Sequence, residues 1–186
     1  MDHATPLWTP SPARIEQAVI TRYRRWLTAR HGLEFAEYES LFRWSVDAPE
    51  TFWETIWEFF GIRSHSPYVR VLDQRVQPGA KWFEGATVNY AEHALAGASR
   101  PDAATRPAII FQSETQPRRE IAWADLASSV GALTTTLDAL GIVAGDRVVS
   151  FMPNIPESVM ALLATAAKGA IWSSCSPDMG PTSVLD

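Results

Sequence analysis

Residues 123–180 read WADLASSVGALTTTLDALGIVAGDRVVSFMPNIPESVMALLATAAKGAIWSSCSPDMG, and this stretch has the clearest helix and strand patterns of the chain. Its first part has an apolar residue at every third or fourth position, which predicts an amphipathic helix closed by Gly141. The short apolar run RVVSFM follows the turn VAGD and predicts a strand. The apolar stripe of the helix consists of Leu126, Val130, Leu133, Leu137 and Leu140.

The same alternation continues after the strand. Pro156 suits the first position of a second helix, Lys168 suits its last turn and Gly169 suits its end. Val159, Leu163 and Ala166 line one face of that helix. The run AIWSS then predicts a further strand near residues 170–173. Helices that alternate with strands indicate a parallel sheet with right-handed connections and helices covering it.

A β-hairpin precedes this alternation. Its first strand is predicted at Ala108–Gln112, and the segment REIAW returns after the loop TQPRR. We therefore expect an α/β fold in the order β-hairpin, α, β, α, β, with too few strands for a complete sheet. The polar segment GASRPDAATRP marks a domain boundary, so we assign residues 1–100 to one part and residues 101–186 to the truncated start of a second.

Residues 1–100 are mostly helical by their pattern. The segment SPARIEQAVITRYRRWLTARHG predicts one helix with Ser11 as its N-cap and Gly32 as its stop. A second helix should begin at Pro49, and residues 61–88 should form an extended, turn-rich segment with short strands around Val69–Leu72. Large aromatic side chains pack such segments onto a neighbour. Six of the eight tryptophans lie here: Trp8, Trp26, Trp44, Trp53, Trp57 and Trp82.

Composition excludes several classes of function. The net charge of −5 argues against a nucleic-acid or an anionic-membrane surface. No apolar run approaches the roughly 20 residues that span a bilayer, and the N-terminus does not resemble a signal peptide. The single cysteine, Cys175, cannot form an internal disulfide. We therefore expect a cytoplasmic protein without nucleic-acid or membrane partners.

The segment SSCSPDMG follows the last predicted strand. Ligands of open α/β sheets bind outside the carboxyl ends of the strands, so Ser173–Gly180 is a candidate ligand loop; the alternative is a plain polar turn. Cys175 is not expected to be a nucleophile, because no CxxC motif or nearby histidine accompanies it. No His, Cys or Asp spacing predicts a metal site, and the phosphate-loop motifs GxxxxGK[ST] and GxGxxG are missing. We assign no catalytic residue.

The stretch at 121–180 resembles the opening of the adenylate-forming acyl-CoA synthetases, which share its helix–GD(R)V–strand–MPN–PE–helix–GA pattern. The segments APETFWETIWEFFGI and KWFEGATVNYAEHAL resemble the N-terminal extension of the acetyl-CoA synthetase branch. Within that branch, SVDAPETFWETIWEFFGI and GAIWSSCSPDMGPTSVLD look like acetoacetate–CoA ligases. By this resemblance, residues 1–100 are the branch's extension and residues 101–186 begin its AMP-binding domain.

The resemblance implies a ligase that uses ATP, CoA and Mg²⁺ to convert acetoacetate to acetoacetyl-CoA through an acyl-adenylate. The family's phosphate loop and adenylation lysine should lie beyond residue 186, so the missing remainder of the chain is the expected partner. The 186 residues alone are expected to be inactive and to bind none of these ligands tightly. Two alternatives stay open: another short-chain synthetase, specific for acetate or propionate, and a non-catalytic interaction module.

The resemblance also implies a CoA-binding role for Ser176, Pro177 and Asp178. The matching turn of the acetyl-CoA synthetase branch resembles a CoA-contacting loop, with Phe-Gly-Gly where this chain has Ser-Pro-Asp. Asp178 has an alternative role as the N-cap of a helix near Pro181. A further departure is Ala122, where many relatives have a Thr that caps the long helix. Without another cap this costs about 1 kcal/mol of helix stability.

Overall fold

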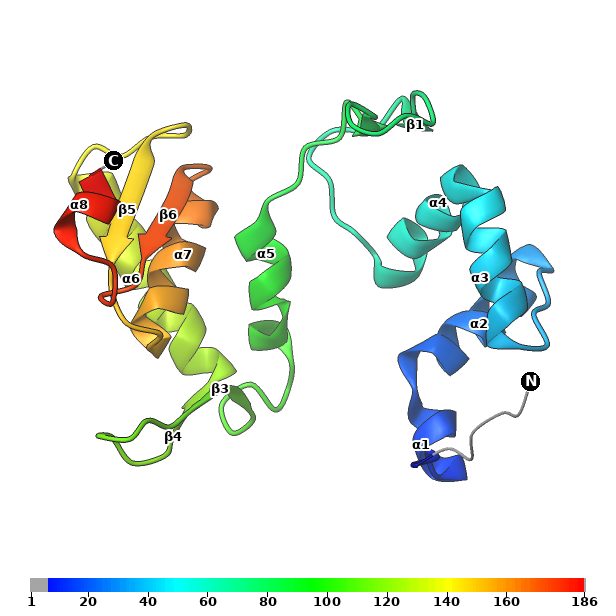
Figure 1. Cartoon of the computed structure of the whole chain (residues 1–186), viewed down its shortest axis with the longest axis horizontal. Coiled ribbons are helices and arrows are strands. Elements are labelled where there is room, and N and C mark those ends of the chain that lie inside the picture. The colour runs from blue at the N-terminus through cyan, green and yellow to red at the C-terminus, as the bar shows by residue number, and fades with distance from the viewer. Residues whose placement is uncertain (1–6, 186) are drawn as a thin grey trace. The chain divides into compact units, whose positions relative to one another are not determined.

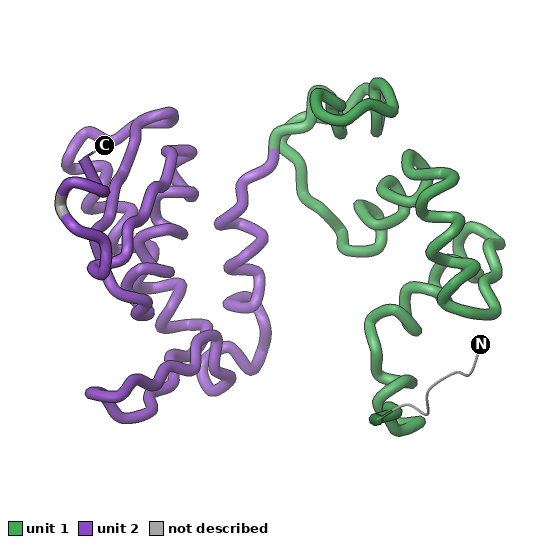
Figure 2. Tube along the Cα trace, in the orientation of Figure 1, with its two compact units in different colours: residues 1–87 green, residues 88–186 purple. Residues whose placement is uncertain are grey.

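The computed structural model describes residues 7–185 and forms two compact units, residues 1–87 and residues 88–186 (Figures 1 and 2). Each unit has its own buried cluster of apolar side chains. The division between the units precedes the domain boundary expected at residues 100 and 101, and that boundary stays a prediction.

The first unit begins with four helices. Instead of one helix from Ser11 to Gly32, the structure has two, because Ala18 is extended (ψ 141°) and serves as the N-cap of the second. The single-helix prediction is therefore wrong. Three consecutive β-branched residues, Val19–Thr21, start the second helix, and such residues propagate a helix poorly. The helices are α1 (Pro12–Gln17), α2 (Val19–His31), α3 (Tyr38–Asp47) and α4 (Pro49–Phe60).

The predicted ends of these helices are confirmed. The Ser11 hydroxyl accepts a hydrogen bond from the Arg14 N–H at 3.3 Å, and Gly32 ends α2 in the left-handed conformation (φ 65°). Pro49 is the first residue of α4. Only glycine adopts a positive φ without a steric cost from a β-carbon, which explains why Gly32 occupies the C-cap of α2.

The core of this unit is aromatic. Tyr23, Leu27 and Leu41 are buried. Trp26 and Trp44 are partly buried and pack against them, as the packing interpretation predicts. Three other tryptophans do not follow it as closely, because Trp8, Trp53 and Trp82 are 67%, 43% and 44% exposed. After α4, the strands β1 (Arg70–Leu72) and β2 (Trp82–Glu84) form an antiparallel pair. The short strand predicted around residues 69–72 is therefore confirmed.

The second unit has the predicted order β-hairpin, α, β, α, β. Its hairpin is antiparallel, and its last two strands are parallel and consecutive in register from the Arg147–Ile171 pair to the Phe151–Cys175 pair. The elements are α5 (Tyr90–Ala94), the 3-10 helix η1 (Leu95–Ser99), β3 (Pro107–Phe111), β4 (Arg119–Ala122), α6 (Trp123–Ala139), β5 (Arg147–Phe151), α7 (Pro156–Ala167), β6 (Ile171–Cys175) and α8 (Pro181–Leu185).

The stripe predicted on α6 forms the core of this unit, with one exception. Leu126, Val130 and Leu137 are buried and pack with Leu163 of α7. Leu140 is 71% exposed, so its assignment to the buried stripe is wrong. It is the C-cap residue of α6, where the chain leaves the helix, and it follows the last helical residue.

The N-terminus of α6 has no side-chain cap, as expected from Ala122. Main-chain carbonyls take over part of that role. The Trp123 N–H donates to the Arg106 carbonyl at 3.2 Å, and the Ala124 N–H donates to the Ala103 carbonyl at 3.0 Å. These bonds satisfy two of the amide groups that a helix leaves unpaired at its start, so the missing Thr costs less than a wholly uncapped end would.

One face of the β5–β6 pair is open in the described structure. α7 packs on β6 (Figure 1). Val149, Phe151 and Ile171 are 65%, 54% and 55% exposed. Parallel sheets are normally covered on both faces, so these three apolar side chains mark a surface suited to further covering structure.

Candidate functional site

The carboxyl ends of β5 and β6 lie side by side, as their arrowheads in Figure 1 show. Phe151 and Cys175 are the last register pair, and the Met152 N–H donates to the Cys175 carbonyl at 3.2 Å. The loops after the two strands therefore leave the sheet together. This is the edge at which α/β sheets bind ligands, and it carries the predicted residues Ser176, Pro177 and Asp178.

The segment Ser176–Met179 is a hydrogen-bonded turn. The Met179 N–H donates to the Ser176 carbonyl at 3.1 Å, which places Pro177 at the second position, where its fixed φ is favoured. The Ser176 hydroxyl donates to Asp178 Oδ2 at 3.0 Å and accepts from the Asp178 N–H at 3.4 Å. These side chains are exposed. The turn is thus an exposed, small and locally stabilised structure.

The polar side chains of the turn are bonded to each other. Its serine hydroxyl and carboxylate bind each other, so it offers a shaped surface more than free hydrogen-bonding groups. Small side chains let a slender ligand approach the backbone closely. Gly180, and not Asp178, directly precedes α8, while the Asp178 carboxylate accepts from Ser176.

The loop from β5 to α7 forms the second side of this edge, and its role there was not predicted from the sequence. Pro153 and Asn154 are exposed there. The Ser158 hydroxyl and the Ile155 N–H both donate to the Pro153 carbonyl, at 3.0 and 2.8 Å. The signal that could have found it is the parallel pairing of the two strands. With their carboxyl ends level, the loop after β5 is expected beside Ser176.

Within residues 7–185, no group of three or more His, Cys, Asp and Glu side chains is placed to hold a metal ion. Cys175 is partly buried at the end of β6. None of the described helices is both long enough and apolar enough to cross a membrane.

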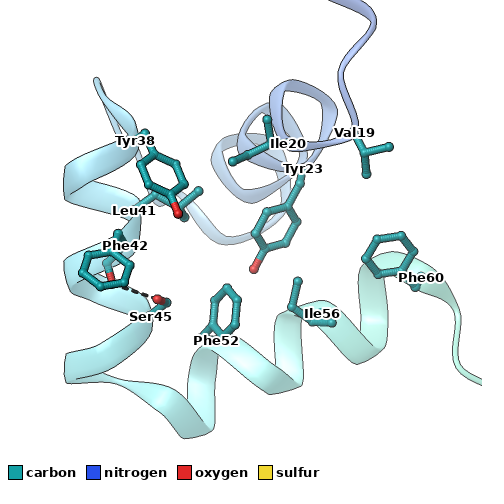
Figure 3. Close-up of a pocket in the computed structure, with 10 residues that line it drawn as sticks. All are labelled: Val19, Ile20, Tyr23, Tyr38, Leu41, Phe42, Ser45, Phe52, Ile56 and Phe60. Carbon is teal, nitrogen blue, oxygen red and sulfur yellow. Dashed lines mark hydrogen bonds between the residues drawn. The ribbon is translucent and has the colours of Figure 1, made fainter. Parts of the chain in front are cut away.

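A separate cavity of about 360 Å³ lies in the first unit, among α2, α3 and α4 (Figure 3). Its wall is almost entirely apolar, and Figure 3 shows the rings of Tyr23, Phe42 and Phe52 bordering it. Tyr38 and Phe60 at this wall are more than half exposed. The cavity was not predicted from the sequence, because the helix α3 on one side of it was not predicted.

Comparisons with known proteins agree with the order of the two units. Residues 38–94 match the family model of the acetyl-coenzyme A synthetase N-terminus, and residues 98–185 match that of the AMP-binding enzymes. The chain is 37% identical to acetoacetyl-coenzyme A synthetase of Rhizobium meliloti, over 100% of this chain and 28% of the relative. It is 36% identical to acetoacetyl-CoA synthetase of Danio rerio, over 97% of this chain and 26% of the relative.

A solved structure shows the same likeness. Acetoacetyl-CoA synthetase from Streptomyces lividans superposes with a TM-score of 0.87 at 50% sequence identity, over 97% of this chain and 28% of that one. The chain thus spans about a quarter of the length of the relatives it matches. Residues 98–185 are thus similar to the AMP-binding enzymes, and nearly the whole chain is similar to the N-terminal part of the acetoacetyl-CoA synthetases that it matches.

Proposed function

We propose that the chain forms the N-terminal part of an ATP-dependent acetoacetate–CoA ligase. The observation that carries this proposal is the likeness to acetoacetyl-CoA synthetases over nearly the whole chain, which includes the turn at Ser176–Asp178. The reaction converts acetoacetate, ATP and CoA to acetoacetyl-CoA, AMP and pyrophosphate.

The two steps of this reaction follow from the chemistry of carboxylates. A carboxylate is a poor acyl donor, so its oxygen first attacks the α-phosphorus of ATP, and pyrophosphate leaves. The CoA sulfur then attacks the acyl carbon of the adenylate, and AMP leaves. The charge of the triphosphate must be offset in the first step. In the longer enzyme Mg²⁺ would offset part of this charge.

Within the longer enzyme, Ser176, Pro177 and Asp178 line the passage of the pantetheine arm of CoA. The proposal is supported by their place at the carboxyl edge of β6, by their exposure and by the closed turn that they form. A preformed turn binds a slender arm without a further ordering cost. The hydrogen bond from Ser176 to Asp178 partly offsets the negative charge that the aspartate presents to a phosphorylated ligand.

The remainder of the ligase is the proposed partner of the open β5–β6 face. The exposed side chains of Val149, Phe151 and Ile171 support this, since a parallel sheet needs cover on both faces. On this account the 186 residues by themselves catalyse no acetoacetate-dependent exchange between ATP and pyrophosphate, and they bind ATP and CoA weakly. The assembled enzyme works in the cytoplasm.

A chimera tests the proposed function. Residues 1–186 replace the matching N-terminal segment of the Streptomyces lividans enzyme, and the product is offered acetoacetate, acetate and propionate. We expect acetoacetyl-CoA formation with a preference for acetoacetate. A folded chimera that adenylates only acetate or propionate would contradict the acetoacetate assignment. One that adenylates none of the three carboxylates would contradict the proposed function as a whole.

A further inference from the structure

The carboxamide of Asn154 is a free hydrogen-bonding group at the carboxyl edge of β5 and β6. It is exposed on the loop between β5 and α7, and it makes no hydrogen bond with any residue among 7–185. Ser176 and Asp178, on the neighbouring loop, already bind each other. The two loops are brought together by the Met152–Cys175 hydrogen bond that extends the ladder beyond the strands.

The backbone around Asn154 is fixed before any ligand binds. The carbonyl of Pro153 accepts from the Ile155 N–H and from the Ser158 hydroxyl, and prolines at positions 153 and 156 limit φ on both sides. A side chain on such a fixed loop loses less conformational entropy on binding than one on a mobile loop. The backbone that carries Asn154 is therefore held in place, and its exposed carboxamide is left available to a ligand.

We infer that Asn154 binds a secondary amide of the pantetheine arm of CoA; this inference rests on the proposed function. A carboxamide has two N–H donors and a carbonyl acceptor, so it can pair with either end of a secondary amide. It is neutral, and it does not repel the phosphates of CoA as a carboxylate does. Asn154 thus supplies hydrogen bonds, while the Ser176–Asp178 turn supplies the shape of the passage.

The experiment uses Asn154→Ala in the chimera described above. We expect the KM for CoA to rise about five- to tenfold, the loss that one neutral hydrogen bond produces, with acetoacetate-dependent ATP–pyrophosphate exchange unchanged. Pantetheine, which keeps both amides but lacks the nucleotide, should show the same fold-change in KM. The matched control is Gln116→Ala, which removes an exposed carboxamide from the β3–β4 loop and should leave both KM values unchanged.

Three results would overturn the inference. An unchanged KM for CoA would show that Asn154 does not touch the thiol substrate. A rise for CoA without a rise for pantetheine would place the contact on the nucleotide instead of the amides. An equal fall of exchange and thioester formation would show that Asn154 supports the fold or the adenylation step. If the chimera with Asn154 intact forms no acyl-adenylate, the proposed function itself fails, which is a different result from these three.

Discussion

The hydroxyls of Tyr23 and Thr55 share a hydrogen bond of 2.6 Å inside the aromatic core of the first unit. Both residues are buried, and Thr55 also donates to the Phe52 carbonyl at 2.7 Å. This bond links α2 to α4 at the centre of the cluster. It satisfies two polar groups that would otherwise be costly to bury.

Tyr23→Phe should therefore destabilise the first unit by about 1 kcal/mol, the net value of one buried hydrogen bond. Urea unfolding followed by tryptophan fluorescence measures it, since Trp26 stacks on Tyr23 at 6.2 Å between ring centroids. The matched control is Tyr38→Phe, because Tyr38 is 63% exposed and should show no change. Equal losses in the two variants would contradict the assignment.

Burial also raises the pKa of Tyr23 above the ordinary value of 10.0, with the Thr55 hydrogen bond opposing part of that rise. Above pH 10.0 the unfolded chain loses this proton while the folded chain keeps it. The contribution to stability is thus full below pH 10.0 and falls as the pH rises through the folded pKa. Alkaline unfolding should lose part of its pH dependence in Tyr23→Phe, and an unchanged alkaline profile would exclude this contribution.

Gly97→Ala should destabilise the second unit by about 1–3 kcal/mol, the usual cost of overpacking. A β-carbon at Gly97 would overlap the indole of Trp123, with Cε3 at 2.6 Å, so η1 or the ring must move. Gly131→Ala is the control, because a β-carbon there meets nothing within 4 Å. In the middle of α6 it should stabilise by about 0.5–1 kcal/mol. Thermal unfolding that shows the same sign for both would refute the prediction.

The Arg119 guanidinium donates to Glu157 at 2.9 and 3.1 Å, and this hydrogen bond lowers the pKa of Glu157 below its ordinary value of 4.5. The pair stabilises the fold above pH 4.5, and the contribution is lost as the pH falls through the lowered pKa. Because the two side chains are 41% and 48% exposed, the ion pair is worth less than about 1 kcal/mol and weakens in salt.

Arg119→Gln should return the pKa of Glu157 toward 4.5, measured by NMR of the side-chain carboxyl carbon. Arg118→Gln is the control, because Arg118 pairs with Glu120 and should not affect Glu157. A pKa of Glu157 that is the same with and without Arg119 would show that the ion pair does not form in solution.

Periodicity predicted the second unit well because local signals and packing agree there. Leu126, Val130 and Leu137 repeat at helical spacing, and they are buried in the structure. Leu140 continues the same spacing but falls at the helix end, where the next residue, Gly141, has φ 79°. Spacing alone cannot show where a helix stops facing its core.

The first unit was harder to predict because its breaks carry no strong signal. Ala18 is extended although Ala is a good helix former, and neither proline nor glycine marks the break. The candidate site also has one part that the sequence predicts and one part that it does not. The turn at Ser176–Asp178 is recognisable from its residues. The place of Asn154 depends instead on the register between β5 and β6, and no single sequence motif contains both strands.

Ser176→Trp in the chimera tests the central claim, that this turn lines the CoA passage of an acetoacetate–CoA ligase. The bulky ring should raise the KM for CoA or slow thioester formation, while acetoacetate-dependent ATP–pyrophosphate exchange stays nearly intact. Ser128→Trp on the exposed surface of α6 is the control and should change neither. A loss of both steps together, or of neither, would contradict the account and make the segment a structural turn.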